Sequence, residues 1–353
     1  MKKGLSIVFW VLLSSTGLFT QTDKLNQRAG ILQNRKGEHI SFRNFKKYSP
    51  KANEPAIGRA KRILIYDNKV FVLDERFHRL YVFDNEAHYL FTVGRPGQGP
   101  GDLEYPRDFL ISDHGEIFIL NSRGKQIEVF SPKGEFKKRL FLNIPKDYMY
   151  SRPTNIVLQN DSFYVGYHLS PSYVDEYNKA GDFKKNLYKR IKPIYIPGKN
   201  LANCSHMLVT DGGRTILHFD FFSGIFSKIQ MNNSSILQFS THVDKIEKYI
   251  SRVNSNIQKN RNKKHSRVDS VFFHHWSDFC VDQKGHIYVF SLLSSQEKSP
   301  ELFVFSTEGD FLYSTIVSYF KGKRIKLFAC SADELFVFIT EEEELFYTIK
   351  KGG

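Results

Sequence analysis

The chain has 353 residues, enough for two ordinary domains or for one large closed all-β domain. Aromatic residues make up 15% of it, so a large core can be buried, and no segment beyond the first 22 residues is long and apolar enough to span a membrane. The formal charge of +14 indicates either an anionic partner or general solubility, and nucleic acid is disfavoured because no RNA- or DNA-binding motif is present.

The N-terminus has the pattern of a signal peptide. Lys2 and Lys3 precede an apolar stretch at residues 5–13, and small and polar residues follow. The stretch is far shorter than the roughly 20 residues that a bilayer requires. We therefore expect residues 1–22 to be removed and the protein to be exported, either periplasmic or secreted. No cysteine follows the stretch, so lipid attachment at a new N-terminal cysteine is not expected.

A sequence pattern repeats after about 47 residues, which indicates a repeat architecture. The run VFVLD at residues 70–74 returns as IFILN at 117–121, and LYVF at 80–83 returns as IEVF at 127–130. Each unit reads as four short strands, the size of a propeller blade. We expect an all-β, six-bladed β-propeller of four-stranded blades. The blades are predicted at 62–93, 108–142, 155–189, 206–239, 278–315 and 326–349.

The last of these blades has room for only three strands. A strand predicted at residues 39–45, within an N-terminal segment of residues 23–58, would complete it and close the ring formed by residues 59–353.

The longest departure from the repeat is an insertion at residues 241–270, between blades 4 and 5. Apolar residues recur there at steps of three and four and predict a helix; they are Val243, Ile246, Ile250, Val253 and Ile257. The helix would either dock a partner, as a lid with a basic tip, or pack against the rim. The basic residues beyond it could attract an anionic surface; they are Lys259, Arg261, Lys263, Lys264 and Arg267.

A glycine-rich stretch at residues 94–101 lacks the Gly-Lys-Ser/Thr of a phosphate loop and precedes a strand. We expect its glycines to serve a tight crossing between two blades.

The stretch GRPGQGPGDLEYP at residues 94–106, followed by DHGEIFILN and IEVFSPKG, resembles the NHL-type repeat of six-bladed, TolB-like β-propellers. The similarity is strongest over residues 62–142. It implies a binding scaffold first, with lyases and esterases as minority members that add metal-binding residues.

Residues just before the innermost strand of each blade should lie at the mouth of the central channel. These are Arg59 or Arg62, Arg107, Asp108, Asn155, His206, His275 and Trp276. The leading hypothesis is an exported, non-enzymatic module that binds a protein, peptide or glycan there, without a cofactor or metal. The alternative is a metal-dependent hydrolase or lyase with His206 and His275 as ligands in the channel.

Three cysteines, Cys204, Cys280 and Cys330, follow the signal peptide. Their odd number leaves at least one free thiol in an oxidising compartment. We expect buried, inert thiols, with a disulfide as the alternative.

Overall fold

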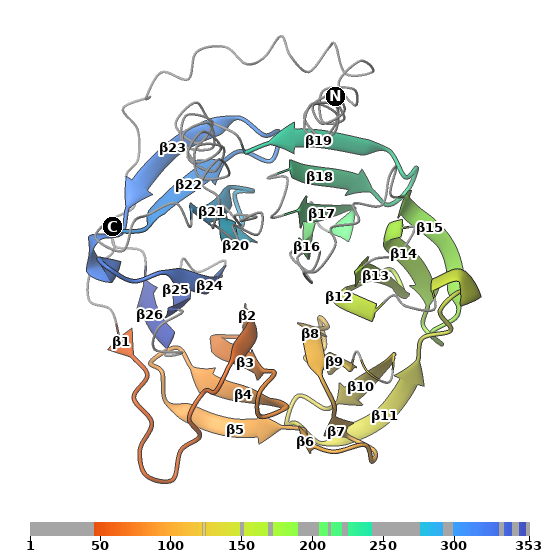
Figure 1. Ribbon diagram of the computed structural model, residues 1–353, viewed down its shortest axis with the longest axis horizontal. Helices are drawn as coiled ribbons and strands as arrows, with labels where there is room; N and C mark the ends of the chain where they lie inside the picture. Colours follow the sequence, from red (N-terminus) through yellow and green to blue (C-terminus); the bar gives the residue numbers. More distant parts are fainter. Residues whose placement is uncertain are drawn as a thin grey trace, which may run out of the picture. The chain divides into compact units, whose positions relative to one another are not determined.

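In a computed structural model, six four-stranded antiparallel sheets surround a common centre (Figure 1). The structure describes residues 46–121, 123, 125–148, 152–168, 172–189, 205–210, 213–220, 225–241, 276–291, 299–331, 335–340 and 346–350. All of them belong to one compact unit, Glu38–Gly353.

The blades follow one another along the chain. Blade 1 contains β2 (Ala60–Tyr66), β3 (Lys69–Asp74), β4 (Arg79–Asp84) and β5 (Tyr89–Val93). Blade 2 contains β8 (Pro106–Ile111), β9 (Ile117–Asn121), β10 (Gln126–Phe130) and β11 (Phe136–Phe141). Blade 3 contains β12 (Arg152–Gln159), β13 (Ser162–His168), β14 (Ser172–Asn178) and β15 (Phe183–Lys189).

Blade 4, the least regular in sequence, contains β16 (Ser205–Thr210), β17 (Thr215–Asp220), β18 (Ile225–Gln230) and β19 (Ile236–Ser240). Blade 5 contains β20 (Trp276–Val281), β21 (Ile287–Ser291), β22 (Glu301–Phe305) and β23 (Phe311–Ile316). Blade 6 contains β24 (Ile325–Cys330), β25 (Leu335–Thr340) and β26 (Phe346–Lys350). Two short 3-10 helices lie in connections, at Lys146–Tyr148 and Ser318–Phe320.

The fourth strand of blade 6 comes from the N-terminal segment, as predicted. It is β1 (Lys46–Lys47), which pairs with β26 through Lys46 opposite Thr348 and Lys47 opposite Tyr347. The strand therefore lies just after the predicted residues 39–45, which are outside the described part of the chain. Tyr48, only 1% exposed, follows β1 and packs into the apolar cluster between blades 6 and 1.

The core lies between blades. Six apolar clusters are found among the described residues, one for each pair of neighbouring blades. Strand β3 shows how one sequence run serves two of them. Val70 and Val72 face blade 6, whereas Phe71 and Leu73 face blade 2, because successive side chains of a strand point to opposite faces of its sheet. A continuous apolar run is thus what a strand between two blades needs.

The first strands of the blades form the inner wall of the ring. They contact one another in the order β2, β8, β12, β16, β20 and β24, and β24 contacts β2 again. The contacts therefore close the six-bladed ring.

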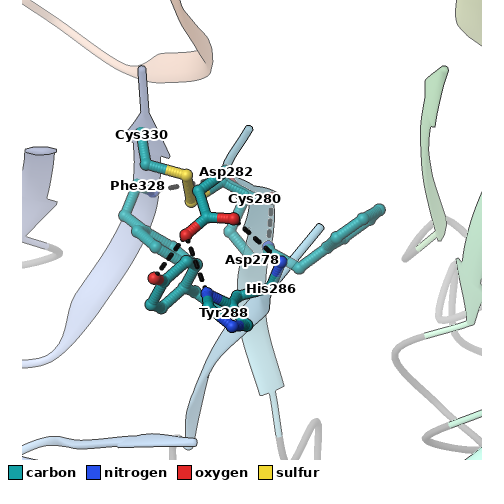
Figure 2. Close-up of a disulfide and its surroundings, with 8 residues drawn as sticks. Asp278, Cys280, Asp282, His286, Tyr288, Phe328 and Cys330 are labelled. Carbon is teal, nitrogen blue, oxygen red and sulfur yellow. Dashed lines mark hydrogen bonds and ion pairs between the residues drawn. A yellow bond between two sulfur atoms is a disulfide. The ribbon is translucent and has the colours of Figure 1, made fainter. Parts of the chain in front are cut away.

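A disulfide joins Cys280 of β20 to Cys330 of β24, with the Cα atoms 5.9 Å apart (Figure 2). The prediction of buried thiols was wrong for these two residues. Cys280 faces blade 6 and Cys330 faces blade 5, within the same inter-blade cluster. Cys204 lies outside the described residues.

The predicted helix at 243–257 and the basic residues from Lys259 to Arg267 also lie outside the described residues. Within the part of the chain that is described, no helix is long and apolar enough to cross a membrane.

Candidate functional site

One edge of each sheet carries the crossings from blade to blade. In blade 1, Ala60 at the start of β2 lies opposite Asp74 at the end of β3, and Asp74 lies opposite Arg79 at the start of β4. Val93, at the end of β5, reaches the same edge because it pairs with Leu80. We call this side of the ring the crossing face, since the chain leaves one blade and enters the next there.

Two buried polar residues fix how the chain enters blades 1 and 2. The carboxylate of Asp74 accepts hydrogen bonds from the amides of Gly58 at 2.5 Å and Arg59 at 3.2 Å. At the corresponding repeat position, Asn121 Oδ1 accepts one from the Glu104 amide at 2.7 Å. The polar residue that ends each VFVLD-like run therefore positions the crossing segment beside it.

The glycine-rich stretch forms a compact crossing between blades 1 and 2, as predicted. Its short strands β6 (Arg95–Pro96) and β7 (Asp102–Leu103) pair in parallel. The Asp102 carboxylate accepts bonds from Arg95 Nε at 2.7 Å and from the Gly99 amide at 2.9 Å, and the bond from Arg95 lowers the pKa of Asp102. A Cβ at Gly97 would lie 2.3 Å from Asp102 Oδ2, so a side chain cannot be accommodated there without movement.

Five of the first strands place a polar residue at corresponding positions near the centre. All five are buried: Arg62, Asp108, Asn155, His206 and Asp278. Asp108 accepts hydrogen bonds from the amides of Phe109 in its own blade and Ile156 in the next, both at 2.9 Å. Asp278 likewise accepts hydrogen bonds from the amide of Phe279 in its own blade, at 2.9 Å, and from the amide of Phe328 in the next blade, at 3.3 Å. Each aspartate thus joins two neighbouring blades.

Four of these side chains form a buried ion cluster. Arg62 Nε lies 3.1 Å from Asp108 Oδ1, and Arg62 Nη1 lies 3.0 Å from His206 Nδ1. His206 Nδ1 in turn lies 2.7 Å from Asp278 Oδ1. Blades 1 and 4 are opposite each other, with β2 and β16 on opposite sides of the centre in Figure 1. The contact between Arg62 and His206 therefore spans the central channel.

The cluster favours a neutral imidazole at His206. Burial lowers its pKa, and the Arg62 guanidinium lowers it further, outweighing the opposite effect of Asp278. The shorter contact indicates that Nδ1–H donates to Asp278. Nε2 is then an acceptor, and it is buried without a hydrogen-bond partner among the described residues.

The structure thus places Asp108, Asn155 and His206 on the first strands of blades 2, 3 and 4, where they are 1%, 7% and 5% exposed. Arg107 is separate from them: a quarter of its side chain is exposed, and Nη1 lies 3.0 Å from Glu75 Oε2. Trp276 begins β20, and His275 lies outside the described residues. Across the described ranges, no group of three or more His, Cys, Asp or Glu side chains could hold a metal ion.

Asp278 was not selected from the sequence. The signal that could have identified it is the Asp-Phe pair at residues 108–109, which returns at 278–279 in the first strand of another blade.

Two residues further along β20, Cys280 forms the disulfide to β24 shown in Figure 2. A nearby turn is held by Asp282, whose Oδ2 lies 3.0 Å from His286 Nδ1 and accepts a 2.8 Å bond from Tyr288.

Comparison with solved structures shows the same fold. A candidate exported protein from Bacteroides fragilis superposes with a TM-score of 0.57 at 14% identity, covering 88% of this chain and 95% of the other. A DUF4221 family member from Bacteroides vulgatus gives a TM-score of 0.55 at 10% identity, with coverages of 88% and 97%. Virginiamycin B lyase from Staphylococcus aureus gives 0.52 at 10% identity, with coverages of 87% and 98%.

None of the curated proteins matches the sequence. A family profile does match, over residues 52–298, and its description agrees with the six sheets of the structure. The chain therefore belongs to the DUF5128 family of 6-bladed β-propellers.

Proposed function

We propose that this protein is an exported, non-enzymatic binding module that holds a protein, peptide or glycan on the crossing face of its propeller. The observation that carries the proposal is the combination of aromatic and cationic side chains on this face. Tyr105 is 44% exposed in the crossing that leads to Arg107, and Phe77 is 40% exposed in the turn after β3. Aromatic residues and arginine are the side chains that most often dominate the energetics of binding interfaces.

Export is supported by the signal-peptide pattern and by the disulfide. Disulfides persist in oxidising compartments and are rare in the cytosol. The Cys280–Cys330 bond thus fits a periplasmic or secreted protein.

The contact surface proposed here includes Arg107 and Trp276, together with His275 and the helix predicted at 243–257, which lie outside the described residues. His206 is assigned to the wall beneath them, because its side chain is 6% exposed and bound to Asp278.

The test is capture of a partner from the exported fraction by the immobilised protein, followed by variants of the crossing face. Arg107→Gln and Trp276→Ala should each weaken the captured complex by about tenfold or more, a typical loss at an energetically dominant contact. Lys133→Gln is the control, because Lys133 is exposed in the turn between β10 and β11, at the opposite edge of the sheet. Unchanged binding by both crossing-face variants would overturn the proposal. A stoichiometric divalent ion in the purified protein would instead favour the metal-dependent enzyme.

A further inference from the structure

A patch on blades 1 and 2 has features that point to one kind of partner. It consists of Arg76, Phe77, His78, Tyr105, Arg107 and Arg123, which lie in the turns, the crossing and the start of β8 at the crossing face. We name these six residues the blade 1–2 patch.

Tyr105 is held in place from two sides while its ring stays accessible. The His78 ring lies with its centroid 5.5 Å away, and the Arg123 guanidinium lies 5.6 Å from the Tyr105 ring centroid. An exposed aromatic ring fixed in this way loses little side-chain entropy when a ligand covers it.

The backbone of Tyr105 is strained. Its φ is +57°, a region that bulky residues rarely adopt, and it precedes Pro106, which normally imposes an extended conformation. Such a conformation costs on the order of 1–3 kcal/mol and occurs preferentially at functional sites. His78 and Lys125, at corresponding positions of the turns after β3 and β9, both have a φ of +49°. The positive φ at His78 and Lys125 therefore recurs from blade to blade as part of the repeated turn. The positive φ at Tyr105 is instead a feature of the crossing between blades 1 and 2.

Charges in and beside the patch are unbalanced. Glu75 binds Arg59 at 2.8 Å and Arg107 at 3.0 Å, and Glu104 binds Arg123 at 2.6 Å. Three arginines therefore share two glutamates. Arg76 is exposed and has no carboxylate partner among the described residues; its guanidinium lies 5.8 Å from the Phe77 ring centroid.

Phe77 adds an apolar surface beside the Arg76 guanidinium. One edge of its ring packs closely on Gly58, where a Cβ would meet Phe77 Cε2 at 2.6 Å, and 40% of the residue remains exposed. A ligand for both side chains needs an anionic group for Arg76 and an apolar group for Phe77. A polypeptide with acidic and aromatic side chains offers both, whereas an acidic polysaccharide has no large apolar group.

From these contacts we infer that the blade 1–2 patch binds an acidic peptide segment that carries an aromatic or apolar anchor. Glutamate or aspartate would pair with Arg76, and the anchor would pack on Phe77 and Tyr105. This inference rests on the proposed function, because it names the partner class for the same face.

The test uses fluorescence anisotropy of a labelled ten-residue peptide that alternates glutamate and tyrosine. Decaglutamate tests the need for the anchor, an alternating lysine and tyrosine peptide tests the charge, and heparin tests an anionic polysaccharide. We expect binding of the first peptide to be at least about fivefold tighter than of the other two peptides or heparin. Arg76→Gln and Phe77→Ser should each weaken it by about fivefold or more.

Matched controls are Lys133→Gln for the lost charge and Phe141→Ser for the lost aromatic side chain, since Phe141 is 58% exposed on the outer strand β11. Both controls should bind within about twofold of the unchanged protein. Equal binding of decaglutamate, preference for heparin, or no binding of the first peptide would overturn the inference. If the peptide inference fails but binding of the captured partner still depends on Arg107 or Trp276, the proposed function stands without the inference. If partner binding depends on neither residue, the inference and the proposed function both fail.

Discussion

The centre of the ring and the blade 1–2 patch use the same residue types in opposite ways. At the centre, Arg62 is 8% exposed and lies between Asp108 and His206. In the patch, Arg76 is exposed and has an aromatic ring as its neighbour. A buried charge must be paired by the protein itself, whereas an exposed one is free to pair with a ligand. The comparison teaches that burial, not residue type, separates the residues that hold the ring together from those available for binding.

The largest effect expected at the centre comes from the disulfide. Because Cys280 and Cys330 are 50 residues apart, replacing both with alanine should lower the free energy of unfolding by about 4 kcal/mol in a chain-entropy estimate. Urea unfolding measures the change. Dithiothreitol should destabilise the unchanged protein and leave the double variant as it was. Equal stability of the two proteins without reductant would show that the bond does not hold blades 5 and 6 together.

Asp278→Ala should have the next largest effect. It removes the hydrogen-bond acceptor of the Phe279 and Phe328 amides and of His206 Nδ1–H, and we expect a loss of about 3 kcal/mol in unfolding free energy. Asp310→Ala, an exposed aspartate in the turn before β23 of the same blade, should change it by less than about 0.5 kcal/mol. Similar losses for both variants would argue against a structural role of the cluster.

The cluster should also make stability depend on pH. Burial and Arg62 lower the pKa of His206 in the folded state, so the unfolded chain takes up this proton first as the pH falls below the usual value of about 6.5. The contribution is complete above that pH and is lost below it, with a slope of at most about 1.4 kcal/mol per pH unit. Urea unfolding between pH 7.5 and 5 should show this slope, and His206→Gln should reduce it. His88→Gln, at an exposed turn, should retain it.

The smallest expected effect sharpens the contrast at the patch. Tyr105→Gly relieves the positive φ and should raise the unfolding free energy by up to about 1 kcal/mol, while it weakens binding of the glutamate and tyrosine peptide. Ser234→Gly, at a φ of +57° in blade 4, should have a similar effect on stability and none on binding. If Tyr105→Gly bound the peptide as well as the unchanged protein, the strain at this position would have no link to binding.

The repeat predicted most of the fold. An inner strand is covered by a neighbouring blade on each face, so it is a continuous apolar run that is easily recognised in the sequence. Residues Val70 to Leu73 of β3 are an example. The predicted closing segment at residues 39–45 lies outside the described residues, and β1 is described directly after it, at Lys46 and Lys47, both exposed. Two exposed lysines carry no apolar pattern, so the pairing with β26 locates this part of the strand.

The candidate site was predicted only in part. Its position along each blade follows from the repeat, and the structure shows that Asp108, Asn155 and His206 on the first strands are buried. The repeat could not show that Arg62 reaches His206 across the ring, because residues 144 positions apart meet only after all six blades have closed.

The sequence by itself determined the blades, since local runs of alternating side chains and turn residues are enough to specify a four-stranded sheet. Only the tertiary structure decided that Cys280 and Cys330 pair, that Asp278 joins the central cluster and that Tyr105 remains exposed between His78 and Arg123. These contacts depend on how neighbouring and opposite blades face one another, and that geometry exists only when the ring is complete.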